Sequence, residues 1–151
     1  EVRPIIRLIR DAAKVVIVKG NHDNYVQNIV ADMGIPVVDY VDIGGYRLEH
    51  GHVDSGVRPV IIGHEHPSVK IVGALSGGFK MQCFMYARKE GVLVIPPFSF
   101  LSSGTDFAMS SDDFMSSACR GANMEEAELF GVTELGLIEL GTLSEVCNIR
   151  I

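Results

Sequence analysis

The residues of this 151-residue chain that could carry chemistry are concentrated in three short turns. The first is GNHD at 20–23, the second is HGH at 50–52, and the third is GHEH at 63–66. Each turn follows a strand-like run, so neighbouring strands would bring the five imidazoles to one edge of a sheet. Histidine is the commonest ligand for borderline divalent metals, and the pattern therefore predicts a metal site.

The segments that must position these turns predict a mixed α/β protein. Apolar residues at helical spacing predict two helices, at 2–12 and at 24–33. Strands are expected at 14–19, buried on both faces, and at 36–43, 46–50, 59–62, 69–75, 79–87 and 91–95. Residues 96–123 predict an irregular segment with one helical turn, and the chain is expected to close with strands at 135–140 and 145–150.

Composition limits the classes of function that remain. The net charge of −6 argues against a broad basic surface for nucleic acid, so any such contact should be local or helped by metal ions. The sequence contains neither an apolar run long enough to span a bilayer nor a secretory signal pattern. Three scattered cysteines, Cys83, Cys119 and Cys147, favour reduced thiols and a cytoplasmic location. The opening Glu1–Pro4 lacks a Met, so the natural amino-terminal part is expected to be absent.

GNHD, HG and GHEH, in this order, resemble the last three motifs of the calcineurin-like metallophosphoesterase superfamily. The continuation, with GHEHP, KMQCF and LVIPPFSFLSSGTD, is similar to the ICC-type predicted phosphoesterases, which include ligase-associated DNA-damage-response endonucleases. The resemblance runs from about residue 14 to about 107 and implies a four-layer α/β/β/α sandwich. Two earlier family motifs, Asp-x-His and Gly-Asp-x-x-Asp, do not occur, so residues 1–151 are expected to be a single domain that lacks its first strands.

The resemblance implies a centre of two divalent transition-metal ions. Asn21, His50 and His64 would bind the second ion, and His66 would reach the first. A mixed nitrogen and oxygen ligand set favours Mn²⁺, with Fe, Zn²⁺ and Co²⁺ as alternatives, over Mg²⁺, which prefers oxygen and water. The absent motifs would supply most ligands of the first ion, so the first position should be poorly occupied in this chain.

The resemblance also implies roles for the other polar residues of the turns. His22 would be catalytic, facing the phosphate and serving the leaving oxygen. Asp23 would brace its loop by hydrogen bonding, and His52 is a second-sphere candidate without a fixed role. The residues that bind the rest of the substrate are not assigned.

The predicted activity is metal-dependent hydrolysis of phosphate esters. Phosphodiesters are favoured, and the partner would be DNA, RNA or a nucleotide rather than a membrane. The oligomeric state is left open, with a homodimer among the options. One alternative is a binding or scaffolding domain with an incomplete metal site. Another is a metallo-β-lactamase-type hydrolase, because HGHVD at 50–54 matches the opening H-x-H-x-D of that signature; the next His of the signature is replaced by Ser55.

Several other residues have a plainer interpretation. Cys83 is expected in the core. The phenylalanines are interpreted as sheet-face packing rather than as a platform for stacked bases; they are Phe79, Phe84, Phe98 and Phe100. The segment Ser102–Asp106 is a candidate wall of the site, with an ordinary surface loop as the alternative.

Overall fold

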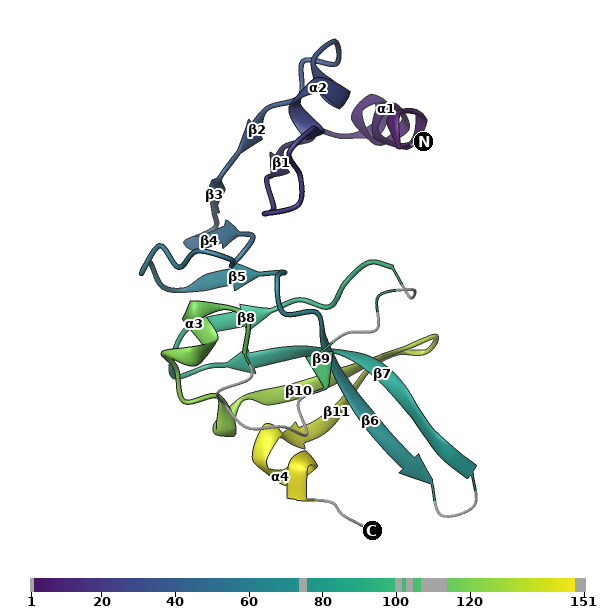
Figure 1. The fold of residues 1–151 in the computed structure, drawn as a ribbon, viewed down its shortest axis with the longest axis vertical. Helices are drawn as coiled ribbons and strands as arrows, with labels where there is room; N and C mark the ends of the chain where they lie inside the picture. Colours follow the sequence, from purple (N-terminus) through teal and green to yellow (C-terminus); the bar gives the residue numbers. More distant parts are fainter. Residues whose placement is uncertain (1, 74–75, 100–101, 103–104, 107–113, 149–151) are drawn as a thin grey trace.

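The computed structural model describes residues 2–73, 76–99, 102, 105–106 and 114–148 (Figure 1). The chain begins with an N-terminal part made of two helices and a two-stranded parallel sheet. Its elements are α1 (Arg3–Ala12), β1 (Ile17–Val18), α2 (Val26–Val30) and β2 (Val37–Val38). Both predicted helices in this part are observed, and the second is shorter than expected.

The larger part contains a nine-stranded mixed sheet among the described residues, with the strand order β11-β10-β7-β8-β5-β4-β3; off this path, β6 pairs with β7, and β9 pairs with β6. Its first strands are β3 (Tyr40–Ile43), β4 (Tyr46–Glu49), β5 (Val60–Ile62), β6 (Pro67–Gly73) and β7 (Ser76–Ala87). They are followed by β8 (Val92–Val94), β9 (Thr105–Asp106), β10 (Glu128–Thr133) and β11 (Gly136–Thr142). The mixed α/β class predicted from the sequence is confirmed.

Three strands at the centre of this sheet are parallel. β5 pairs with β4 on one side and with β8 on the other, and Ile62 is opposite both Glu49 and Val94. The carboxyl ends of these strands therefore lie along one edge of the sheet. The hydrogen bond from Gly63 N to the carbonyl of His50, at 3.1 Å, continues the β4–β5 ladder beyond the last paired residues.

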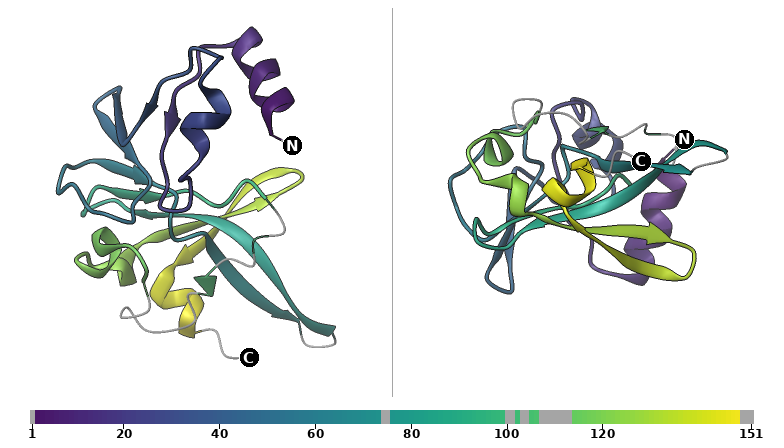
Figure 2. Two further views of the ribbon diagram at one scale, coloured as in Figure 1. Left: turned by 45° about the horizontal axis from the view of Figure 1, so that its top comes forward. Right: turned by 90° about the horizontal axis from the view of Figure 1, so that it is seen from below.

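The N-terminal part and the large sheet are joined through residues 37–43. The predicted strand 36–43 is split at Asp39 into β2 and β3. β2 pairs in parallel with β1, whereas β3 pairs antiparallel with β4 across the predicted Gly44-Gly45 turn. In the left view of Figure 2, the purple and blue N-terminal part lies above the teal to yellow sheet.

The main core lies between the large sheet and three short helical elements. These are α3 (Ser117–Arg120), the 3-10 helix η2 (Met124–Glu126) and α4 (Leu143–Asn148). Fifteen buried residues form this cluster, and Cys83 is among them, as predicted. Because a fully buried Val, Leu, Ile, Phe or Met side chain contributes about 1.5–3 kcal/mol, this cluster contributes more to stability than the three-residue cluster of the N-terminal part.

The prediction that residues 14–19 form a strand buried on both faces is wrong. β1 has only two residues, both half-buried, and Val16 is exposed. The cluster beneath it has three buried members, Val30, Met33 and Ile35. A two-stranded sheet cannot cover both of its own faces, because each face needs a packed layer.

The apolar stripe of α1 is also exposed. Leu8 is 72% and Ile5 is 61% accessible, and of this stripe only Ile6 packs against the small cluster. Arg3 and Arg7 fix the helix by pairing with Asp32 at 2.7 and 3.0 Å.

The prediction of a strand at 145–150 is wrong as well, because Leu143–Asn148 is the helix α4. The signal for a helix is a capping box in Thr142–Glu145. The Thr142 N–H donates to Glu145 Oε2 at 2.8 Å, and the Glu145 N–H donates to Thr142 Oγ1 at 3.3 Å.

The sequence did not predict the strand β10, since Gly131 in its middle interrupts the apolar pattern. A Cβ at Gly131 would overlap Met81 Sδ, so the glycine permits close packing there.

The phenylalanines predicted to pack on the sheet differ in their exposure. The accessibility of Phe98 is 104%, so the prediction that it packs on the sheet is wrong. Phe84 is half-buried at the sheet face, and the side chains of Phe79 and Phe100 lie outside the described residues.

No helix in the described part of the chain has the length and apolar character needed to cross a membrane.

The thiols of Cys83 and Cys119 are buried, and burial raises the pKa of each to about 12. Both are therefore protonated and unreactive at neutral pH.

Candidate metal centre

The ends of β4 and β5 place two histidines side by side. His50 follows β4 directly and His64 lies two residues after β5. Because the strands are parallel neighbours, both side chains emerge at the same edge of the sheet. His64 Nδ1 lies 3.0 Å from His50 Nε2, and the ring centroids are 4.8 Å apart.

The turn after β1 adds Asn21 to this pair. Asn21 Oδ1 lies 3.0 Å from His50 Nε2. The turn is closed by the Gly20 N–H, which donates to Asp23 Oδ2 at 2.8 Å. Gly20 is needed at this point, because a Cβ there would lie 2.9 Å from Asp23 Oδ2 and 3.0 Å from His50 Cε1.

In the orientation observed, hydrogen bonds among Asn21 Oδ1, His50 Nε2 and His64 Nδ1 cannot satisfy all three atoms. His50 Nε2 faces an amide oxygen, which only accepts, and also the ring nitrogen of His64. If Nε2 carries a proton, that one proton serves two acceptors. If Nε2 carries none, its lone pair faces the lone pairs of Asn21 Oδ1. With the side chains in this orientation, His50 Nε2 therefore lies between two other atoms that carry lone pairs.

Electrostatics keeps these imidazoles neutral. Burial is the main cause that lowers the pKa of His50 to about 4, and the nearby rings of His64 and His52 act in the same direction. The pKa of His64 is also lowered, first by burial and then by His52 and His66. An uncharged imidazole is the form that binds metals, so both rings are in this form at neutral pH.

The position of the His50 ring depends on Gly51. Gly51 is buried and has φ +101°, a conformation that other residues rarely adopt. A Cβ at this position would lie 2.8 Å from Ile62 Cβ. The chain therefore passes directly over the end of β5, which keeps His50 close to His64.

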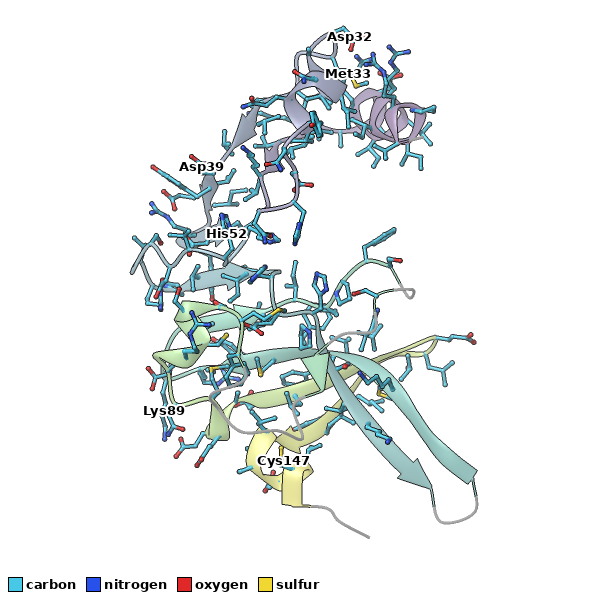
Figure 3. The ribbon with its side chains drawn as sticks, in the orientation of Figure 1. Asp32, Met33, Asp39, His52, Lys89 and Cys147 are labelled. Carbon is cyan, nitrogen blue, oxygen red and sulfur yellow. The ribbon has the colours of Figure 1, made fainter. Side chains whose placement is uncertain are left out.

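The other predicted site residues lie around this trio. His52 is exposed beside β4 (Figure 3), and its ring centroid is 5.3 Å from that of His50 and 6.3 Å from that of His64. His22 is exposed on the turn that carries Asn21, and it is the weakest of the four causes that lower the pKa of His64. His66 is half-buried, and its Nδ1 lies 3.0 Å from Ser102 Oγ.

Two further residues support the site, and sequence reasoning assigned no role to one of them, Glu65. Glu65, between the two histidines of GHEH, is fully buried and accepts hydrogen bonds from the N–H groups of Met115 and Ser116. Burial raises the pKa of Glu65, and these two donors oppose the shift. Glu65 thus anchors the turn to the segment before α3. Ser102 falls in the segment proposed as a wall of the site, and its contact with His66 is a long-range one.

The side chains at this edge of the sheet limit which metal ion could bind between them. Within the described ranges, no group of three or more His, Cys, Asp or Glu side chains is placed to hold a metal ion. The converging trio has two histidines, and its third member is an asparagine. Two ligands bound side by side to one octahedral ion, at about 2.1 Å each, are separated by about 3.0 Å. The distances from His50 Nε2 to Asn21 Oδ1 and to His64 Nδ1 are both 3.0 Å, which matches the spacing of adjacent ligands on one octahedral ion.

The fold is that of an α/β protein whose polar side chains gather at the carboxyl edge of its parallel strands. The crystal structure of Pseudomonas putida nuclease MPE is similar, with a TM-score of 0.64 and 22% sequence identity. The match covers 91% of this chain and 59% of that one, so the chain spans a little over half the length of the nuclease. At this identity the likeness concerns the fold. No family model and no curated protein matches the sequence.

The conformation of Gly51 leads to a prediction about stability. Gly51→Ala should lower the free energy of unfolding by about 2–6 kcal/mol, because it adds left-handed strain to an overpacked contact with Ile62. The matched control is Gly44→Ala. Gly44 also has a positive φ, +60°, but a Cβ there meets nothing within 4 Å, so only strain of about 1–2 kcal/mol is expected. Urea denaturation of the two variants measures the difference, and equal losses would contradict the packing argument.

Proposed function

We propose that this chain provides part of a divalent metal centre that hydrolyses phosphate esters, with nucleic-acid diesters as the favoured substrates. The observation that carries the proposal is the convergence of Asn21 Oδ1, His50 Nε2 and His64 Nδ1, at successive separations of 3.0 Å. These atoms would bind one ion, because a cation resolves the conflict between their lone pairs. His66 would contribute to a neighbouring second ion through Nε2, since its Nδ1 is engaged by Ser102.

The donor set is consistent with a transition metal. Two imidazole nitrogens and one amide oxygen suit Mn²⁺ first, and Fe, Zn²⁺ or Co²⁺ as alternatives. When bound, a pair of such ions supplies an activated water and neutralises charge on the phosphate oxygens. The chain's own contribution is to hold neutral rings at fixed spacing, through the parallel strands and the Gly51 turn.

The remaining residues of the turns would act on the substrate side. His22 is exposed next to Asn21, and adjacent residues of a turn point in different directions. We assign His22 to the phosphate and the leaving oxygen, to which its imidazole would give a proton. Asp23 would keep this turn closed through its bond with Gly20, and His52 would support His50 from the exposed side.

Nucleic acid is the favoured substrate class because the similar fold belongs to a protein described as a nuclease. We further propose that residues 1–151 belong to one domain, since the trio draws on both the N-terminal part and the large sheet. In the complete protein this domain would form a four-layer α/β/β/α sandwich. Segments that carry Asp-x-His and Gly-Asp motifs would then provide the other metal ligands. The sequence upstream of Glu1 tests this directly.

The binding or scaffolding alternative shares this trio, and measured turnover separates the two. The β-lactamase alternative requires Asp54 as a metal ligand. The Asp54 carboxylate instead pairs with the Arg58 guanidinium at 2.9 Å, and this hydrogen bond is the main cause that lowers the pKa of Asp54. This ion pair favours a structural role for Asp54.

The first prediction from this proposal concerns metal binding. The chain should bind one Mn²⁺ ion, and His50→Ala should weaken that binding at least tenfold, because it removes the central donor of the trio. His52→Ala is the matched control and should weaken binding much less, since its exposed ring lies beside those of His50 and His64 but is not one of the three proposed ligands. Titration calorimetry or Mn²⁺ electron paramagnetic resonance measures the affinities. Equal weakening in both variants would remove His50 from the centre.

The second prediction concerns His22 in the complete protein. His22→Gln should leave metal content nearly intact and should lower turnover by roughly 10²- to 10⁴-fold, the range for a lost general acid. The loss should shrink for p-nitrophenyl esters, whose leaving group needs little protonation. Metal analysis together with the rates on good and poor leaving groups provides the test. Loss of the metal, or an equal loss on all substrates, would show that His22 is a ligand or a structural residue.

The third prediction separates the two hydrolase classes. Asp54→Asn should leave Mn²⁺ affinity within about twofold of the wild type, because Asp54 binds Arg58 rather than the centre. The same calorimetric titration provides the measurement. A loss of affinity comparable to that of His50→Ala would favour the β-lactamase alternative.

A further inference from the structure

The turn between β5 and β6 contains a strained residue. His66 has a φ of +50°, and it is the only residue other than glycine with a positive φ in the described part of the chain. A residue with a Cβ is unfavourable in this left-handed region, and a residue before proline favours a φ of about −120°. Because Pro67 follows His66, both effects act on the same residue. Such a conformation persists only where the surrounding structure holds it in place.

The sheet holds the two ends of this turn. His64 lies two residues after β5, and the bond from Gly63 N to the carbonyl of His50 continues the β4–β5 ladder up to this point. On the other side, Pro67 is fully buried and begins β6. Residues 65 and 66 lie between these two fixed ends, so strand pairing alone does not set their conformation.

Glu65 fixes the middle of the turn through contacts with a distant segment. Its side chain is fully buried, and its two carboxylate oxygens accept from the N–H group of Met115, at 3.1 Å, and from that of Ser116. Two N–H donors need two acceptor oxygens, and Gln would offer one acceptor and one donor at the same positions. The pairing therefore requires a carboxylate at position 65 rather than its neutral analogue.

The segment that binds Glu65 is fixed in the main core. Phe114 is buried and belongs to the fifteen-residue cluster, as does Ala118 of α3. The Arg120 guanidinium closes the segment by donating to the carbonyl of Phe114 at 2.7 Å and to that of Met115 at 2.8 Å. The N–H groups that hold Glu65 are therefore presented from a well-packed part of the fold.

We propose that Glu65 is a positioning residue, which holds His66 in its strained conformation and so directs the His66 ring to the neighbouring second ion. The contact of His66 Nδ1 with Ser102 Oγ, at 3.0 Å, leaves Nε2 for that ion. Glu65 acts on one of the two ions, because the ladder holds His64 whereas His66 lies beyond it. The role at the ion rests on the proposed function, but the role in the backbone does not.

Urea unfolding of this chain in EDTA tests the backbone role. Ala at position 66 keeps the left-handed strain and Gly relieves it, so His66→Gly should have a higher urea midpoint than His66→Ala. At an unstrained position Gly would be the less stable of the two, so the sign of the difference reports the strain. An equal midpoint, or a lower one for His66→Gly, would overturn the proposal.

The same two variants in a Glu65→Gln background test whether Glu65 holds the strain. Loss of one acceptor should let the turn relax, so the advantage of Gly over Ala at position 66 should disappear or reverse. A carboxylate that only stabilised the fold would lower both midpoints equally when replaced. An unchanged difference between Gly and Ala would therefore contradict the positioning role.

Glu49→Gln is the matched control for this background. Glu49 is also buried and also precedes a histidine of the trio, but it accepts from the Ser55 N–H, so the difference at position 66 should survive. Should Glu65→Gln not fold, Ser116→Pro removes one N–H donor from the other end of the contact. The φ of Ser116 is −78°, which a proline ring permits, so this variant should abolish the advantage of Gly in the same way.

Metal binding in the complete protein tests the role at the ion. Glu65→Gln should weaken binding of the ion at His66 by roughly 10- to 100-fold, the range for a lost outer-shell partner, and should affect the trio of Asn21, His50 and His64 far less. Titration calorimetry measures both Mn²⁺ binding steps, and His66→Ala identifies the step that depends on His66. Equal weakening of both ions, or of neither, would overturn the role. If the wild type binds no Mn²⁺, the proposed function fails, and the unfolding experiments alone decide whether Glu65 holds the strained turn.

Discussion

Parallel pairing of β4 with β5 is the interaction on which the site depends. Opposed residues such as Glu49 and Ile62 fix the register, and the ladder continues through the bond from Gly63 N to His50 O. A shift by one residue would turn His50 to the other face of the sheet, away from His64. The buried Val60 and Ile62 hold this register, because a slip would move them out of the main core.

The imidazole rings of His50 and His64 are half-buried and uncharged. Strand ends at the edge of a well-packed sheet remove water from the imidazoles, and this keeps them uncharged, although the Asp23 carboxylate acts on the pKa of His50 in the opposite direction. The same packing brings Asn21 Oδ1, His50 Nε2 and His64 Nδ1 so close together that their lone pairs face one another. Stability is supplied elsewhere, by the fifteen-residue cluster between the large sheet and the short helical elements. The edge can therefore hold an unfavourable arrangement of donors, which under the proposed function would serve binding rather than folding.

Local features were predictable from the sequence and long-range ones were not. The three histidine-bearing turns follow β1, β4 and β5 as expected, because strand-like runs and the glycines beside the histidines are local signals. The contact between Glu65 and Ser116 spans 51 positions, and that between His66 and Ser102 spans 36, so no spacing rule reveals them. The helix α4 in place of a strand at 145–150 is signalled locally by the capping box of Thr142 and Glu145. The exposure of β1 and α1 depends on what packs around them, which an apolar pattern alone does not specify.

The split of one strand at Asp39 has a consequence for cooperativity. Asn21 belongs to the part built on the small cluster of Val30, Met33 and Ile35, whereas His50 and His64 belong to the large sheet. Regions with separate cores open as separate units in hydrogen exchange, and the one with fewer buried contacts opens first. A ligand that binds all three donors is released when either unit opens, so its binding energy couples them. The bound protein would then exchange as one unit, and the N-terminal helices would gain protection far from the ligand itself.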